Sequence, residues 1–203
     1  MRYWSIFAAA TLAVLMLAMS SGAWAASKRV ALVIGNSNYQ AVSQLVNPRN
    51  DSTDVAAALQ RLGFEVMLFH DLNYDNMRRN LREFSRRAQG SERALVYFAG
   101  HGIEVNGTNY LIPVDAQLRN DLDVQFEAIP LDSGMLAVEG AGELRMLLLD
   151  ACRNNPFLNK IKKTSSTRSI GRGLARVEPA VGTLVSFAAK EGTTADDGEG
   201  RNS

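Results

Sequence analysis

The chain has 203 residues, of which 22 are basic, 21 are acidic and 46% are hydrophobic. This length suffices for one domain with a sizeable core and makes a second full domain unlikely on size alone. Because the charges nearly balance, no global field draws the chain to nucleic acid or to anionic lipid. Function must therefore be sought in a local site.

The first 26 residues have the three parts of a secretory signal peptide. Arg2 supplies the positive end, residues 6–19 form an uncharged apolar run, and the AWA motif at 23–25 is a small-x-small cleavage pattern. We expect cleavage to release residues 27–203 without a stable membrane span, into the periplasm or the medium. An uncleaved N-terminal anchor is the alternative, although the apolar run is short for a span.

Five apolar runs are typical of buried strands, at residues 29–35, 64–69, 94–98, 145–149 and 183–188. A tight hairpin turn is expected at 105–108, where Asn-Gly stands between two extended segments. The polar and basic stretch 158–176 is typical of a long exposed linker.

Two helices are expected between the first three strands. The first would be capped by Asn50 or Asp51 and end at Gly63, with apolar positions at helical spacing. Those positions are Val55, Leu59 and Leu62, and the corresponding positions of the second helix are Met77, Leu81, Phe84 and Ala88. Alternating strands and helices predict an α/β fold with a mostly parallel sheet.

Two reactive side chains follow neighbouring strands of this expected sheet. His101 comes shortly after the strand 94–98, and Cys152, the single cysteine, comes shortly after 145–149. Ligands of open parallel sheets bind beyond the carboxyl ends of the strands, so both residues are expected in loops at that edge. A lone cysteine is more often a small buried hydrophobe, and its neighbours must decide between the two interpretations.

Pairing with an imidazole would make this cysteine a nucleophile. A free thiol has a pKa of about 8.5 and needs an electropositive neighbour to become a thiolate at neutral pH. His101 can fill that role and can later protonate the leaving amine. The backbone amides of Gly102 and Cys152 are candidates for the oxyanion hole.

Several motifs together resemble the caspase, metacaspase and paracaspase clan. YFAGHG contains His101 and DAC contains Cys152, and the spacing of about 50 residues between histidine and cysteine is that of caspases. RVALVIGNSNY, GTNYLIPVDA, DACRNNPF and GTLVSFAAKEGTTADDGEGRNS also resemble the bacterial metacaspase-like branch, so the similarity extends over nearly all of residues 29–203.

The resemblance implies a three-layer α/β sandwich of the caspase type, catalytic His101 and Cys152, and an oxyanion contact at Gly102. The implied activity is a cysteine endopeptidase that acts on peptides or proteins through a thioester. The family pattern continues beyond Ser203, so the catalytic domain, residues 27–203, is expected to be incomplete at its C-terminus. A non-catalytic caspase-like binding module, or a truncated remnant, is the alternative function.

Two aspartates bear on substrate choice. The resemblance to metacaspases places Asp51 and Asp150 in an acidic pocket for a substrate Arg or Lys, although Asn47-Pro48 replaces the Gly-Cys pair of the metacaspase motif near Asp51. A carboxylate pair suits a cationic side chain, so cleavage after Arg or Lys is expected rather than after Asp. Asp51 has capping of the helix as a second interpretation.

The sequence predicts no cofactor, because two histidines and one cysteine have no zinc-ligand spacing. Calcium activation occurs in some metacaspases, and neither it nor the oligomeric state follows from these residues. The basic stretch 158–176 could be cut by an enzyme selective for Arg or Lys, and a solvated loop is the simpler interpretation.

Overall fold

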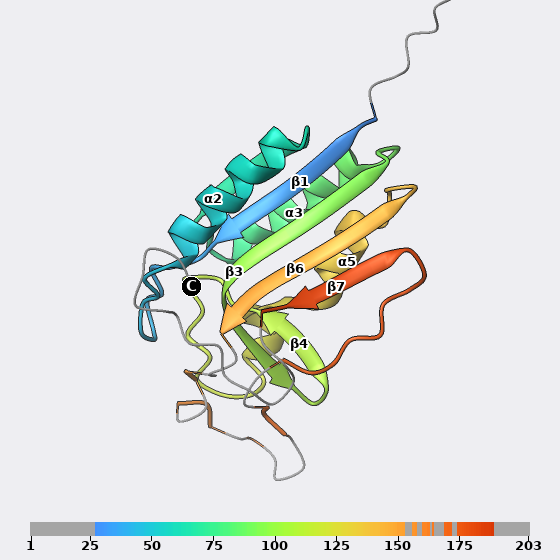
Figure 1. The fold of residues 1–203 in the computed structure, drawn as a ribbon. Coiled ribbons are helices and arrows are strands. Elements are labelled where there is room, and N and C mark those ends of the chain that lie inside the picture. The colour runs from blue at the N-terminus through green and yellow to red at the C-terminus, as the bar shows by residue number, and fades with distance from the viewer. Residues whose placement is uncertain are drawn as a thin grey trace, which may run out of the picture.

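A computed structural model gives the fold of the domain and describes residues 27–152, 156–157, 160–162, 164, 169–171 and 174–188 (Figure 1). The expected signal peptide lies outside these residues. The strands are β1 Arg29–Gly35, β2 Glu65–His70, β3 Arg93–Val105, β4 Thr108–Leu111, β5 Ile129–Pro130, β6 Leu144–Cys152 and β7 Thr183–Phe187. The helices are α2 Pro48–Arg61, α3 Tyr74–Ala88, α4 Val124–Glu127 and α5 Leu131–Val138. Within the described residues, no helix is long and apolar enough to span a membrane.

The main sheet is parallel and runs in the order β2-β1-β3-β6-β7. The chain leaves β1 toward β2 and returns past β1 to β3, so the strand order reverses between β1 and β3. At such a switch point the loops diverge from the carboxyl ends of the strands and leave a crevice. Beyond this point β3 continues and pairs antiparallel with β4, which in turn pairs with β5.

Helices cover both faces of the sheet, which gives three layers (Figure 1). α2 packs on one face, where Ala56 and Leu59 join alternate residues of β1 and β3 in an apolar cluster. α3 and α5 pack on the other face, over the larger cluster. The expected α/β sandwich with a mostly parallel sheet is confirmed.

The helix α3 follows the prediction from its apolar spacing. Its four predicted core positions, Met77, Leu81, Phe84 and Ala88, are all buried. Asn73 caps the helix, since its side chain accepts a hydrogen bond from the backbone N–H of Asn76 at 2.9 Å.

The start of α2 differs from the prediction. The helix begins at Pro48, with Asn47 at the N-cap position and no side-chain capping bond, so Asp51 lies inside the first turn and does not cap. Proline suits the first helical turn because its missing N–H has no partner there anyway. Leu62, expected in the core, is 62% exposed because the helix ends before it, whereas Gly63 terminates α2 as predicted, with φ of 80°.

The third and sixth strands are longer than predicted. β3 extends to Val105 and β6 extends to Cys152, so His101 and Cys152 lie in strands and not in loops. The continuation of β3 is held by pairing with β4, through the expected hairpin at Asn106 and Gly107, whose φ angles are both positive.

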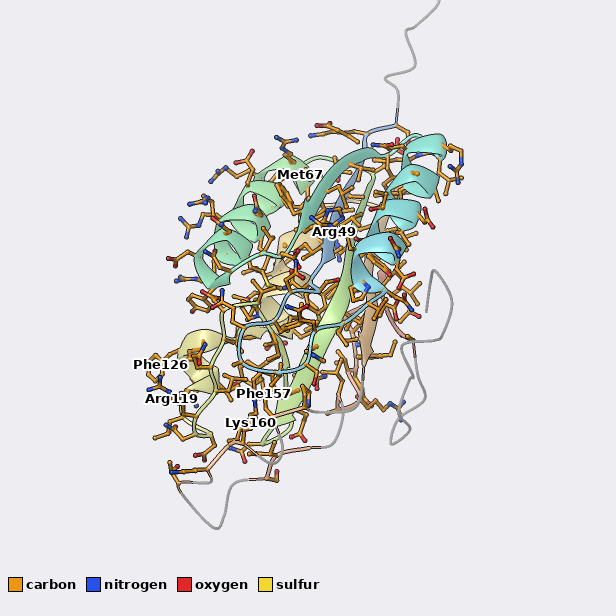
Figure 2. All side chains as sticks on the ribbon, turned by 90° about the vertical axis from the view of Figure 1, so that its left-hand side faces the viewer. Arg49, Met67, Arg119, Phe126, Phe157 and Lys160 are labelled. Atoms are coloured by element: carbon orange, nitrogen blue, oxygen red, sulfur yellow. The ribbon has the colours of Figure 1, made fainter. Side chains whose placement is uncertain are left out.

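The segment predicted as an exposed linker is partly packed. Among its described residues, Ile161 and Leu174 are buried at 7% and 3% exposure. Ile161 joins Phe157 in a second apolar cluster beyond the carboxyl edge of the sheet. Phe157 is labelled beside Lys160 in Figure 2. Apolar side chains spaced widely in a basic stretch give no periodic signal, which is why the sequence did not indicate this packing.

Candidate active site

The carboxyl ends of β3 and β6 bring the two candidate catalytic residues together. The strands are parallel and adjacent, and their register makes His101 the partner of Cys152 and Ala99 the partner of Asp150. Backbones of paired strands lie about 4.8 Å apart. The sequence prediction that both residues meet at one edge of the sheet therefore agrees with the backbone register, although both arrive there as strand residues.

The histidine ring is held by the loop that follows β1. His101 is 4% exposed, and its Nε2 lies 3.2 Å from the carbonyl oxygen of Ser43. A carbonyl oxygen can only accept a hydrogen bond, so Nε2 carries the proton in this contact. In the neutral ring Nδ1 is then the basic nitrogen, which is how a fixed partner selects the tautomer of a histidine.

Tyr39, from the same loop, holds the backbone of His101. Its hydroxyl accepts a hydrogen bond from the His101 N–H at 2.7 Å and donates one to the carbonyl of Ile112 at 3.2 Å. The hydroxyl thus bridges the His101 N–H and the Ile112 carbonyl, which in a regular ladder would bond each other directly. The two rings also contact each other, with centroids 4.4 Å apart.

Gly100 leaves room for this arrangement. A Cβ atom at position 100 would lie 2.6 Å from the Tyr39 hydroxyl, which is closer than non-bonded atoms tolerate. Glycine before the histidine therefore permits the close approach of the tyrosine.

The loop itself is fixed by Asp71, at the end of β2. Asp71 Oδ1 accepts hydrogen bonds from the backbone N–H groups of Ser37 and Asn38 at 2.8 and 2.9 Å. Asn36 adds a second attachment, because its side chain accepts from the N–H of Leu72 and donates to the carbonyl of Ile112. Asn36 is fully buried and Asp71 is partly buried, and polar groups with this many partners hold one backbone conformation.

The peptide group between His101 and Gly102 has a defined orientation. The N–H of Ile112 donates to the carbonyl of His101 at 3.0 Å, so that carbonyl points toward β4. The N–H of Gly102 belongs to the same planar peptide and points the opposite way, toward the β6 edge. This is the side on which the register places Cys152.

Both candidate pocket aspartates lie near Tyr97 on β3. The Tyr97 hydroxyl donates to Asp150 Oδ2 at 2.9 Å, and Asp51 is 8% exposed in the first turn of α2. Burial raises the pKa of Tyr97, and the charges of Asp150 and Asp51 raise that pKa further. The hydroxyl therefore stays protonated and donates to Asp150.

Three residues of this site were missed by the sequence analysis. Tyr39 and Ser43 lie in a polar loop without periodicity, and Ser43 acts through its backbone carbonyl, which any residue type provides. Tyr97 lies within an apolar strand and was interpreted as core.

Comparison with known proteins identifies the family of this site. The family model described as the caspase domain matches residues 28–203. The chain belongs to the caspase domain family. Its membership accounts for the general class of the site, that of a cysteine peptidase.

Two curated relatives match with similar strength. Mucosa-associated lymphoid tissue lymphoma translocation protein 1 of Homo sapiens is 33% identical over 152 residues, and its Mus musculus homolog is 32% identical over the same length. Each match covers 70% of this chain and 18% of the relative, so the chain corresponds to a small part of those proteins. The Drosophila initiator caspase Dronc has a similar fold, with a TM-score of 0.55 and 16% identity over 81% of this chain and 56% of that one.

Among the described residues, no group of three or more His, Cys, Asp or Glu side chains is arranged to hold a metal ion.

Proposed function

We propose that this chain is a cysteine endopeptidase in which Cys152 is the nucleophile and His101 is the general acid and base. The observation that carries the proposal is the parallel register of β3 and β6, which makes these two residues partners at the carboxyl edge of the sheet. Membership of the caspase domain family supports the same reaction class.

The reaction begins with the thiolate of Cys152, which attacks the carbonyl carbon of the scissile peptide bond. His101 takes the thiol proton on Nδ1, while the Ser43 carbonyl holds the proton on Nε2. The imidazolium then protonates the leaving amine as the C–N bond breaks, leaving a thioester. Water, deprotonated by His101, hydrolyses the thioester and restores the thiol.

The negative oxygen that forms during the attack requires hydrogen-bond donors close to Cys152. We propose the N–H of Gly102, which points toward β6, and the N–H of Cys152 as these donors. Removing one such donor from an enzyme typically lowers the rate about 100- to 1,000-fold.

Substrate preference follows from the acidic residues around Tyr97. Asp150 and Asp51 bring two negative charges to the α2 side of the site, and a guanidinium or ammonium group would neutralise them. We propose that the enzyme cleaves after Arg or Lys. The Tyr97 hydroxyl donates to Asp150 Oδ2 and so holds that carboxylate in position.

We also propose that the domain acts outside the cytoplasm, in the periplasm or the medium, after removal of the N-terminal 26 residues. The support is the sequence of the signal peptide alone. N-terminal sequencing of the exported protein tests it: a mature chain that begins at residue 26 or 27 is expected, and a retained Met1 would contradict cleavage.

The peptidase is tested with peptides that carry a fluorogenic group after Arg, Lys or Asp, and a chain that begins at residue 27. We expect cleavage after Arg and Lys, with little after Asp. Cys152→Ala and His101→Ala should each lower the rate by about 1,000-fold or more, since a nucleophile and its base act as one unit.

Three other outcomes would contradict parts of this proposal. Cleavage that persists in Cys152→Ala would exclude this nucleophile. Cleavage after Asp would overturn the acidic pocket and leave the catalytic pair intact. A folded chain that cleaves none of the peptides would favour a caspase-like binding module.

A further inference from the structure

A groove runs between α3 and α5, on the face of the sheet opposite α2. It has a volume of about 340 Å³, which is within the range of about 300–1,000 Å³ that small-molecule sites occupy. Leu81, Ile129 and Ala137 are its apolar residues from the core, and Leu136, 65% exposed, is at its rim. The groove therefore offers an apolar surface to a ligand of limited size.

Two arginines line this apolar groove. Arg78 and Arg82 are one helical turn apart on α3, and like charges at this spacing destabilise a helix. No described residue that lines the groove is acidic. The nearby carboxylate of Glu83 instead bonds Arg86 and Arg87, farther along α3.

The guanidinium of Arg78 is held in position at the groove. It lies over the ring of Tyr74, 5.3 Å from the ring centroid, in a cation–π contact. Arg82 forms no ion pair with a described carboxylate. The helix thus maintains two neighbouring positive charges above an apolar surface, at a cost in stability that an anion would relieve.

We propose that the groove binds a small amphipathic carboxylate, an organic acid with an aliphatic body. The carboxylate would bridge Arg78 and Arg82, since guanidinium groups recognise carboxylates through paired hydrogen bonds. The aliphatic body would cover Leu81, Ile129 and Leu136. Ser85 and Ser133 also line the groove and add two hydroxyl groups to it.

This site is separate from the candidate active site. α3 and α5 cover one face of the sheet, whereas α2 with Asp51 covers the other. Binding in the groove is therefore measured directly and does not depend on peptidase activity.

Octanoate is the probe, titrated into isotopically labelled protein and followed by amide chemical shifts. We expect saturable shifts at residues of α3 and α5, with a dissociation constant of about 1 mM or below, as befits a small ligand. Octylamine, with the same aliphatic chain and the opposite charge, should not bind there.

Matched variants test the contribution of the arginine charge separately from that of the apolar surface. Arg82→Gln should weaken octanoate binding about tenfold, because one charge-assisted contact is lost. Arg79→Gln, on the same helix next to Arg78 but outside the groove, should leave binding unchanged. Leu136→Ser should also weaken octanoate binding, because it removes apolar surface from the groove while both arginines remain.

Thermal unfolding of each variant verifies that it is folded. The proposal is overturned if octanoate produces no shifts at about 10 mM, if octylamine binds equally well, or if Arg79→Gln and Arg82→Gln lose affinity to the same extent.

Discussion

The layer between the sheet and the helices α3 and α5 differs from the carboxyl edge of the same sheet in the kind of side chain that it buries. The layer is an apolar cluster that includes Phe84, Phe98 and Met77, all fully buried. The carboxyl edge instead buries polar side chains, among them Asn36, Ser52 and His101. Burying a polar group is unfavourable unless it is bonded, so their concentration at one edge indicates that this edge serves a site, while the layer serves stability.

The largest effect on stability is expected from the apolar layer. Phe84→Ala should lower the free energy of unfolding by about 3–5 kcal/mol, through lost burial and the cavity left behind. Chemical denaturation measures this, with the exposed Leu62→Ala as the control, expected to change stability by less than about 0.5 kcal/mol. Equal losses in the two variants would contradict the assignment of the core.

An intermediate effect is expected from Tyr39, at the carboxyl edge. Tyr39→Phe keeps the ring but leaves the His101 N–H and the Ile112 carbonyl without the hydroxyl between them, which should cost about 1–3 kcal/mol. If the tyrosine positions His101 for catalysis, kcat should fall while KM stays nearly constant. Tyr74→Phe, at the partly buried start of α3, is the control, and a rise in KM with unchanged kcat would argue against this role.

The smallest effect is expected from Tyr97, and it depends on pH. The pKa of Tyr97 is raised in the folded state by burial and by Asp150, so folding favours the protonated hydroxyl. Its contribution to stability is complete below the unfolded pKa of about 10 and is lost as the pH rises beyond it. Denaturation between about pH 8 and 11 should show a smaller alkaline loss in Tyr97→Phe, with Tyr110 retaining a share because its pKa is also raised. An unchanged alkaline loss would contradict this.

The fold could be predicted well where a local sequence pattern matches the burial of the side chains. α3 has apolar residues at each turn, and β1 is a continuous apolar run, so local pattern and tertiary packing agree there. The ends of β3 and β6 could not be predicted, because a polar His and a Cys followed by Arg resemble loop residues. Pairing with β4, and the Tyr39 hydroxyl inserted beside that pair, are tertiary effects that local sequence does not record.

The candidate site was only partly accessible from the sequence. His101, Cys152 and Asp150 belong to distinctive motifs, and the register brings their positions to one edge. Ser43 contributes its backbone carbonyl, which every residue type has, so the sequence could not indicate this contact. Asp51 was assigned two roles, and the start of α2 at Pro48 removes the capping role.

The pairing of His101 with Cys152 is tested most directly by the reactivity of the thiol. Cys152 is the single cysteine of the chain, so alkylation by iodoacetamide reports on it alone. We expect the alkylation rate to rise with a midpoint well below pH 8.5, and the midpoint to return to about 8.5 in His101→Ala, because the imidazolium stabilises the thiolate. Identical pH profiles in the two proteins would contradict the catalytic pair.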